Sequence, residues 1–389
     1  MLTNEWTGGY GGVPPFDAVR IDEFEPALEW AMAQHLEEVE RIAESAEAPT
    51  FENALESLER AGRAVERVFS VFEVWSANVS TPEFREIERE MAPRLAAFAD
   101  RVTQNEALFR RIEAVYEGAK ANGLTPEQQR LAWQYWTRFV RAGARLEGAE
   151  KARLSAINQR LAALFTQFNQ NVLADEDGQW LLLESEADLA GVPQTQVAAA
   201  AAAAEEKGFA GKWLIANTRS SMEPFLTYAA RRDLRERGWR MWTERGLHPG
   251  EHDNMPLVRE ILVLRAERAR LLGYDTHAHW RLEKAMARDP QRALDLLTTI
   301  WPKAAARVAQ EVAEMQALAA AEGDDIRIEP WDYRYYAEKV RAANFALDQN
   351  RIKEYLQLDR VRDALFHLTG ELFGLQFRRV EDVPVFHPD

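Results

Sequence analysis

Residues 151–172 read KARLSAINQRLAALFTQFNQNV and give the clearest indication of the fold class. Its larger aliphatic and aromatic side chains recur every three or four residues, at Leu154, Ile157, Leu161, Leu164, Phe168 and Val172. That spacing places all six on one face of an α-helix, where they form a stripe that can be buried against other helices. The stretch therefore predicts a long helix in the core of a helical protein.

The same kind of signal continues on both sides. Thr81-Pro82-Glu83 and Thr125-Pro126-Glu127-Gln128 each combine an N-cap threonine, a proline at the first helical position and an early acidic residue. Thr50 is a candidate N-cap for a helix that runs toward Val79, and the helix after Thr125 is expected to extend past Glu150. Further helices are predicted at Glu223–Arg245, Asn254–Leu272, Ala278–Ala287, Pro290–Ala321, Asp332–Ala346 and Ile352–Leu372. We predict an all-α fold of one or more large multi-helix lobes.

Strand signals are few. Gln179-Trp180-Leu181-Leu182-Leu183 reads as a short strand or an extended crossing. Near the end of the chain, apolar residues alternate with polar ones at Leu375, Phe377, Val383 and Val385, which predicts one β-strand beginning there. A single strand cannot satisfy its ladder hydrogen bonds, so we expect its partners to lie beyond Asp389.

Composition excludes several function classes. The chain has 389 residues, 47% of them hydrophobic, and 63 acidic against 48 basic side chains give a formal net charge of −15. Unselective nucleic-acid binding is therefore not expected, because phosphate neutralisation needs clustered Lys and Arg. There is no cysteine, which rules out disulfides and thiolate metal sites. The start lacks a signal-peptide pattern, and the longest run of small apolar residues, 197–204, is too short to span a membrane. These features predict a cytoplasmic protein, or a periplasmic one if a signal peptide was removed.

Candidate metal ligands are weak. None of the seven histidines belongs to an H-E-x-x-H sequence, which would place two imidazoles on one helix face. His277 and His279 are two residues apart, so a helix would point their rings to different faces. His248 and His252 share a loop with two acidic residues, but a solvated surface loop is the better interpretation. Gly-rich phosphate loops and a nucleophile elbow are also absent, so the sequence predicts no metal or catalytic centre within these residues.

Aromatic residues gather at Trp331, Tyr333, Tyr335 and Tyr336. Helical spacing puts Tyr333 and Tyr336 on one face and Trp331 and Tyr335 on another. Tyrosines could line a peptide channel, because they combine apolar area with a hydroxyl group. Packing between helices is the alternative, and we favour it, because most aromatic side chains of this kind serve cores.

Several motifs, in order along the chain, resemble the zinc peptidases of the thimet oligopeptidase and dipeptidyl carboxypeptidase family, with the bacterial dipeptidyl carboxypeptidases the more similar branch. The motifs near the end are Pro330-Trp331-Asp332 with Tyr335-Tyr336-Ala337-Glu338, Leu347-Asp348-Gln349-Asn350 with Lys353-Glu354-Tyr355-Leu356, and Val383–Asp389. The earlier ones are Pro15-Phe16-Asp17, Pro49–Asn53, Phe165–Asn171, Lys212–Ile215, Gly250–Asn254 and Leu272-Gly273-Tyr274. Trp331, Asp332 and Tyr336 match the family motif and are our candidates for substrate-channel or junction residues.

The resemblance implies a helical protein with a deep channel that admits short peptides, and a zinc ion that activates water. The family's H-E-x-x-H is absent, so we expect this chain to be inactive alone and to hold no zinc. A downstream catalytic half would be its partner. Residues 1–20 then form an extended lead-in, 21–330 a helical half, and 331–389 the start of the catalytic region, cut before the metal motif. The alternative is a non-catalytic helical binding or scaffold module.

Overall fold

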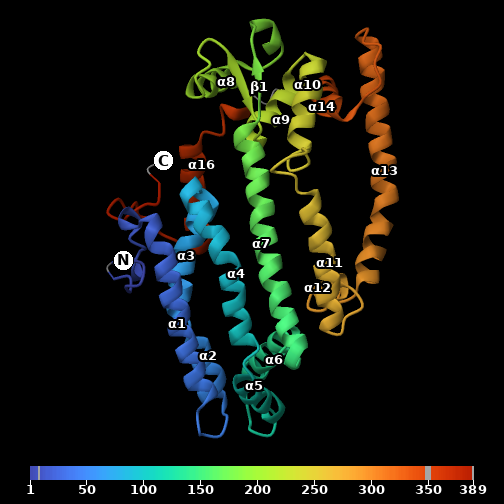
Figure 1. Ribbon diagram of the computed structural model, residues 1–389. Helices are drawn as coiled ribbons and strands as arrows, with labels where there is room; N and C mark the ends of the chain where they lie inside the picture. The colour runs from blue at the N-terminus through green and yellow to red at the C-terminus, as the bar shows by residue number, and fades with distance from the viewer. Residues whose placement is uncertain (8, 347–351, 388–389) are drawn as a thin grey trace. The chain divides into compact units, whose positions relative to one another are not determined.

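The computed structural model describes residues 1–7, 9–346 and 352–387, and most of them are helical (Figure 1). The all-α prediction is confirmed. Internal contacts divide the chain into two compact units. Unit 1 comprises Met1–Gln170, Met255–Pro290 and Asp382–Asp389, and unit 2 comprises Asn171–Asn254 and Gln291–Glu381, the undescribed residues apart.

Unit 1 is built from antiparallel helices. Its α-helices are α1 (Phe24–Ala43), α2 (Ser57–Arg60), α3 (Arg63–Asn78), α4 (Pro82–Thr103), α5 (Glu106–Gly118), α6 (Pro126–Arg141), the larger part of α7 (Gly148–Gly178), α11 (Met255–Leu271) and α12 (His277–Leu282). Short helical turns cover Gly9–Gly11, Phe16–Ala18 and Ile21–Glu23, and a π-helical turn covers Phe51–Glu56. One apolar core lies between α1, α3 and α4, and a second lies between α1, α5 and α6.

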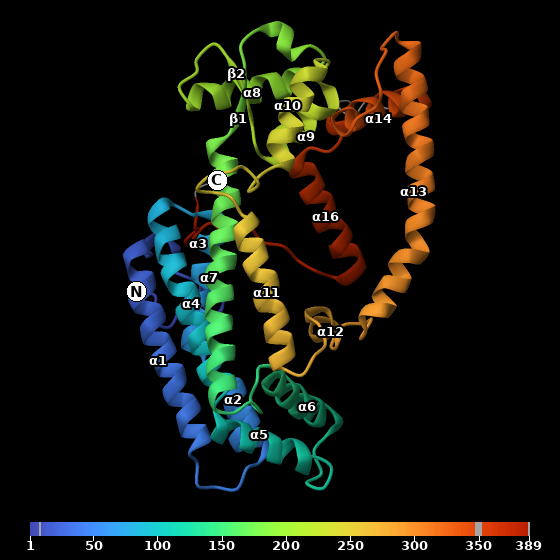
Figure 2. The same ribbon diagram turned by 45° about the vertical axis from the view of Figure 1, so that its right-hand side comes forward.

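The stripe on α7 is buried as predicted over most of its length. Leu154, Ile157, Leu161 and Leu164 are all at most 1% exposed. Ile157, Leu161 and Leu164 pack against Leu257, Ile261 and Leu264 of α11, which lies alongside α7 in Figure 2. Phe168 and Val172, at the end of the stripe, are only half-buried.

The helix starts predicted at Thr81 and Thr125 are confirmed, but several predicted helices are shorter than expected or divided. The helix predicted at Glu223–Arg245 is two helices, Arg219–Tyr228 and Arg232–Thr243, and the one predicted at Ala278–Ala287 ends at Leu282. The side chains of Thr81 and Thr125 accept hydrogen bonds from the backbone N–H groups of Phe84 and Gln128, and Gln128 completes a capping box. The helix after Thr50 breaks at Gly62, whose φ of +81° and contact with the His35 ring leave no room for a Cβ. The helix after Thr125 ends at Arg141, before Gly143, which has a φ of +91°.

Unit 2 combines a small sheet with helices. Strands β1 (Trp180–Leu183) and β2 (Trp213–Ala216) pair antiparallel, with Trp180 opposite Ala216. The helices are α8 (Gln194–Glu206), α9 (Arg219–Tyr228), α10 (Arg232–Thr243), α13 (Pro290–Ala321, all but its first residue), α14 (Pro330–Phe345) and α16 (Leu358–Phe373), and a short helical turn covers Glu186–Leu189. The sheet and helices α8, α9 and α10 share an apolar core that includes Leu181, Ile215 and Phe225.

The strand predicted near the end of the chain is wrong. Residues 374–387 form no strand, and Leu375, Phe377 and Val385 are 52%, 48% and 59% exposed. The alternation is present, but no described segment pairs with it, and a strand needs a paired neighbour to satisfy its backbone hydrogen bonds. The short strand at Trp180–Leu183 is confirmed, and its partner, β2, is a strand that the sequence did not single out.

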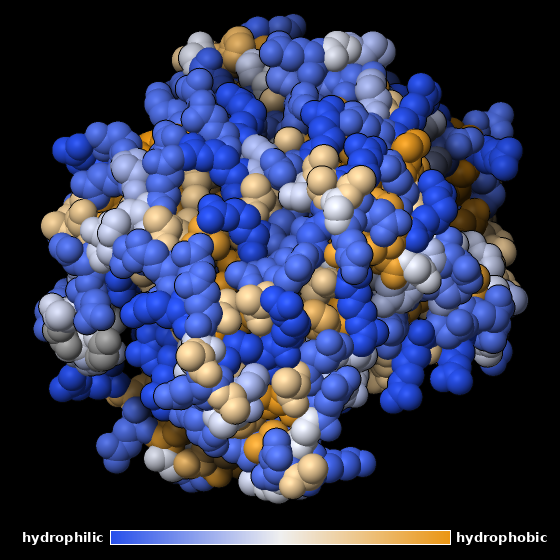
Figure 3. Space-filling model, turned by 60° about the horizontal axis from the view of Figure 1, so that its bottom comes forward, coloured by the Kyte–Doolittle hydropathy of each residue, from blue (hydrophilic) through white to orange (hydrophobic). Residues whose placement is uncertain are grey.

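Charged and polar residues dominate the face drawn in Figure 3, where hydrophobic residues are scattered between hydrophilic ones. Among the described residues, no helix combines the length and the apolar character needed to cross a bilayer.

Candidate functional site

The candidate residues lie in unit 2 at the start of α14. Pro330 occupies the first helical position, and the backbone N–H of Glu329 donates a hydrogen bond to the Asp332 carboxylate over 3.2 Å. An acidic residue in the first turn also interacts favourably with the helix dipole. The sequence thus places a carboxylate at the N-terminus of α14 for local reasons.

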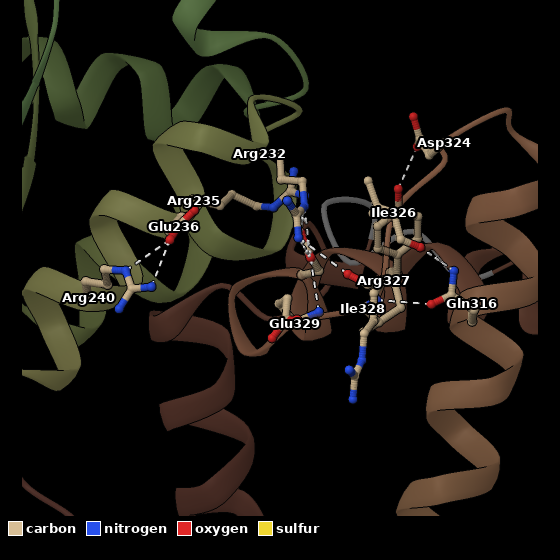
Figure 4. Close-up of polar contacts among 12 residues, drawn as sticks. Arg232, Arg235, Glu236, Arg240, Gln316, Asp324, Ile326, Arg327, Ile328 and Glu329 are labelled. Atoms are coloured by element: carbon tan, nitrogen blue, oxygen red, sulfur yellow. Dashed lines mark hydrogen bonds and ion pairs between the residues drawn. The ribbon is translucent and has the colours of Figure 1, made fainter.

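Asp332 is fully buried and paired with two arginines of α10. Arg235, 2% exposed, contacts one carboxylate oxygen at 2.8 Å, and Arg232 contacts the other at 2.9 Å. Arg235 also donates to the carbonyls of Ala229 and Ala230 at 2.8 and 3.1 Å. Figure 4 shows both arginine side chains extending from α10 toward the segment that contains Glu329. The hydrogen bond to Asp332 raises the pKa of Arg232. This ion-pair cluster joins α10 to α14 inside unit 2.

Trp331, the preceding residue, lines a groove in unit 2 with a volume of about 650 Å³. Its ring lies 5.8 Å from that of Trp239, and Arg240 lies over it at 5.2 Å. The other lining residues are Leu226, Thr227, Trp242, Pro330, Tyr333, Arg334, Ala337, Glu338 and Arg341. The indole N–H groups of Trp331 and Trp242 are buried and have no hydrogen-bond partner among the described residues. The groove therefore offers aromatic faces to a ligand, while these two indole N–H groups are covered by the protein itself.

Tyr336 faces a different environment from Trp331. It is 2% exposed and packs with Met315 and Ala319 of α13. Its hydroxyl donates to Asp324 over 2.6 Å, and burial, followed by this bond, raises its pKa. The three candidates thus occupy three positions: Trp331 lines the groove, Asp332 belongs to the ion-pair cluster, and Tyr336 anchors α14 to α13.

Sequence reasoning missed the partners of these residues. Trp239 and Trp242 stand three residues apart on α10. Arg232 and Arg235, earlier on the same helix, are also three residues apart. This periodicity was a usable signal, because residues three apart share a helix face. The pairing of Arg235 with Asp332 bridges 97 positions, and no local pattern identifies it.

The histidine pairs do not assemble a metal site. Thr276 caps α12, and its hydroxyl lies 2.8 Å from His279 Nδ1. Burial and the neighbouring Arg265, Arg268 and Arg281 lower the pKa of His277 to about 4, and such a cationic environment does not favour a metal ion. His248 Nδ1 lies 3.4 Å from Asp175. Within residues 1–7, 9–346 and 352–387, no three His, Asp or Glu side chains are grouped to hold an ion.

Comparison with known proteins identifies the family. Residues 27–151 match the Neurolysin/Thimet oligopeptidase N-terminal domain, and residues 225–389 match Peptidase family M3. The chain is similar to dipeptidyl carboxypeptidase of Escherichia coli, with 34% identity over 97% of this chain and 55% of the relative. It is 31% identical to oligopeptidase A of Salmonella typhimurium, over 97% of this chain and 56% of that protein. It is also 29% identical to a probable cytosolic oligopeptidase A of Arabidopsis thaliana, over 97% of this chain and 54% of that protein.

The chain spans about 55% of the length of the two bacterial dipeptidyl carboxypeptidases to which it is similar. Two family profiles cover separate parts of the sequence, and the similarity to the bacterial enzymes runs through almost all of it. The chain belongs to peptidase family M3.

Proposed function

We propose that this chain is the N-terminal part of a zinc-dependent oligopeptidase that releases dipeptides from the C-termini of short peptides. The observation that carries the proposal is the 34% identity over 97% of the chain to a protein named dipeptidyl carboxypeptidase. Because H-E-x-x-H is absent from these residues, the zinc ligands and the general base would come from a catalytic half outside them. A cytoplasmic location, or a periplasmic one after removal of a signal peptide, remains part of this proposal.

The groove on unit 2 supports a role in peptide binding. The aromatic side chains that line it can bury apolar area of a bound peptide at low entropic cost. In this proposal Trp331 contacts the peptide as part of a channel wall. Asp332 and Tyr336 are positioning residues, because they hold α14 against α10 and α13 rather than facing the groove.

The first test is activity. We expect the chain alone not to cleave a short blocked peptide, and we expect cleavage when a separately expressed catalytic half and zinc are added. In that mixture Trp331→Ala should raise KM several-fold with a smaller change in kcat, because it removes binding contacts rather than catalytic ones. Trp301→Ala, at a position on α13 that is 70% exposed, is the matched control and should leave both constants unchanged.

Cleavage by this chain alone would refute the proposed division of labour. Full activity of the catalytic half without this chain would favour the scaffold alternative. A parallel assay with a metal chelator distinguishes zinc-dependent hydrolysis from cleavage by a contaminating metal-independent peptidase.

The second test is metal content. After dialysis, elemental analysis of the purified chain should give well under one zinc per molecule, because a structural zinc site needs four ligands and a catalytic one three. Near-stoichiometric zinc that disappears in a His277→Ala/His279→Ala or a His248→Ala/His252→Ala variant would contradict this expectation.

A further inference from the structure

Unit 1 contains a strongly basic pocket that the proposed peptide site does not use. It has a volume of about 600 Å³ and is lined by residues of α6, α7, α11 and the α12 region. Five of the lining side chains are cationic: Arg138, Arg141, Arg268, Arg281 and Lys284. Glu59 is the one acidic residue in the lining, and it accepts a hydrogen bond from Tyr135. This local excess of positive charge stands out in a chain whose net charge is −15.

Trp280 organises three of these cations. The guanidinium carbons of Arg268, Arg141 and Arg281 lie 4.6, 5.2 and 5.9 Å from the centroid of its ring. The indole N–H donates to the Arg141 carbonyl over 3.3 Å, which fixes the ring. Cation–π contacts hold the guanidinium groups near one another although they repel.

The positive charge is poorly compensated. Arg141 pairs with Glu283, but no carboxylate in the described part of the chain lies within ion-pair distance of Arg138, Arg268, Arg281 or Lys284. Arg268 donates to the Asn158 side chain at 3.3 Å, and its Nε is buried without a partner. Partial desolvation within the pocket, and then Arg141 and Arg130, lower the pKa of Lys284 although much of its side chain is exposed. Burial, followed by Arg265 and Arg281, lowers the pKa of Arg268. Glu283 and Asp100 act in the opposite direction on Lys284 and Arg268, respectively, but they do not offset burial and the surrounding cations.

We propose that this pocket binds a small polyanion that carries two or more phosphate groups. A single carboxylate would neutralise only one of the unpaired cations, whereas a di- or triphosphate carries enough charge for several. The planar guanidinium fork matches phosphate oxygens in a bidentate geometry, and the pocket volume accommodates a ligand of this size with water. The site lies wholly in unit 1 and does not depend on the proposed peptidase function.

Calorimetric titration of the 389-residue chain with sodium tripolyphosphate, in magnesium-free buffer at low salt, tests the proposal. We expect one site whose affinity falls as NaCl is raised. The double variant Arg281→Ala/Lys284→Ala should weaken tripolyphosphate binding at least about tenfold, because each of the two substitutions removes a charge-assisted contact. Both residues are exposed, so the double variant should fold. Lys120→Ala/Arg270→Ala removes the same charge from exposed positions outside the pocket and should bind as the parent does.

A second measurement locates the ligand. The extent of arginine modification by phenylglyoxal is measured by peptide mass spectrometry with and without tripolyphosphate. The ligand should protect Arg268 and Arg281 from modification and should leave Arg270 as reactive as before. Absence of saturable binding, equal weakening in both double variants, or equal protection of Arg270 would overturn the proposal. Tighter binding of tetraglutamate than of tripolyphosphate would overturn the phosphate assignment.

Discussion

Asp332→Ala should lower the free energy of unfolding by about 3–5 kcal/mol, the cost of leaving a buried charge without its partner. Arg235, 2% exposed, would keep its guanidinium in the interior with only the carbonyls of Ala229 and Ala230 as acceptors. The variant also removes the hydrogen bond that the Glu329 N–H donates at the start of α14. Urea unfolding followed by circular dichroism at 222 nm measures the loss.

A matched control lies on the same helix. Glu236→Ala removes the nearer of the two carboxylate partners of an α10 arginine, Arg240, but that pair is solvent-exposed, with side chains 50% and 35% accessible. Glu236→Ala should lower the free energy of unfolding by less than about 1 kcal/mol. Equal destabilisation by the two variants would show that burial of Asp332 is not what makes its ion pairs important.

Leu161→Asp should destabilise unit 1 by about 4 kcal/mol or more. Leu161 is 1% exposed and packs within the cluster formed by α7 and α11. The substitution loses the buried apolar contacts of leucine and places an unpaired carboxylate among aliphatic side chains. The melting temperature and the urea midpoint should both fall.

The same substitution at an exposed leucine separates burial from charge. Leu262→Asp, on α11 at a position 58% exposed, should change stability by no more than about 0.5 kcal/mol. Leu161→Met keeps the volume and should cost less than about 1.5 kcal/mol. If Leu161→Asp melts within a degree or two of the parent, the stripe on α7 is not a core face. Because Phe168 is only half-buried, we expect a smaller effect from Phe168→Asp than from Leu161→Asp.

The candidate site was only partly accessible to sequence reasoning. The resemblance singled out Trp331, Asp332 and Tyr336, and an aromatic motif at the start of a helix was visible without the structure. Their separate environments were not visible, because these depend on α10 and α13, which reach α14 from distant parts of the sequence. The basic pocket is a similar case, since its cations come from residues 138–141 and 268–284.

Local sequence patterns were enough to establish the helical class, the caps at Thr81 and Thr125, the buried stripe on α7 and the absence of H-E-x-x-H. These follow from spacings within four residues, where helix hydrogen bonds and side-chain faces are set. The three-dimensional fold was needed to show that β1 pairs with β2, that residues 374–387 form no strand, and that Arg235 neutralises Asp332. A ladder or a buried ion pair needs a partner that the chain brings from far away, and local spacing carries no information about that partner.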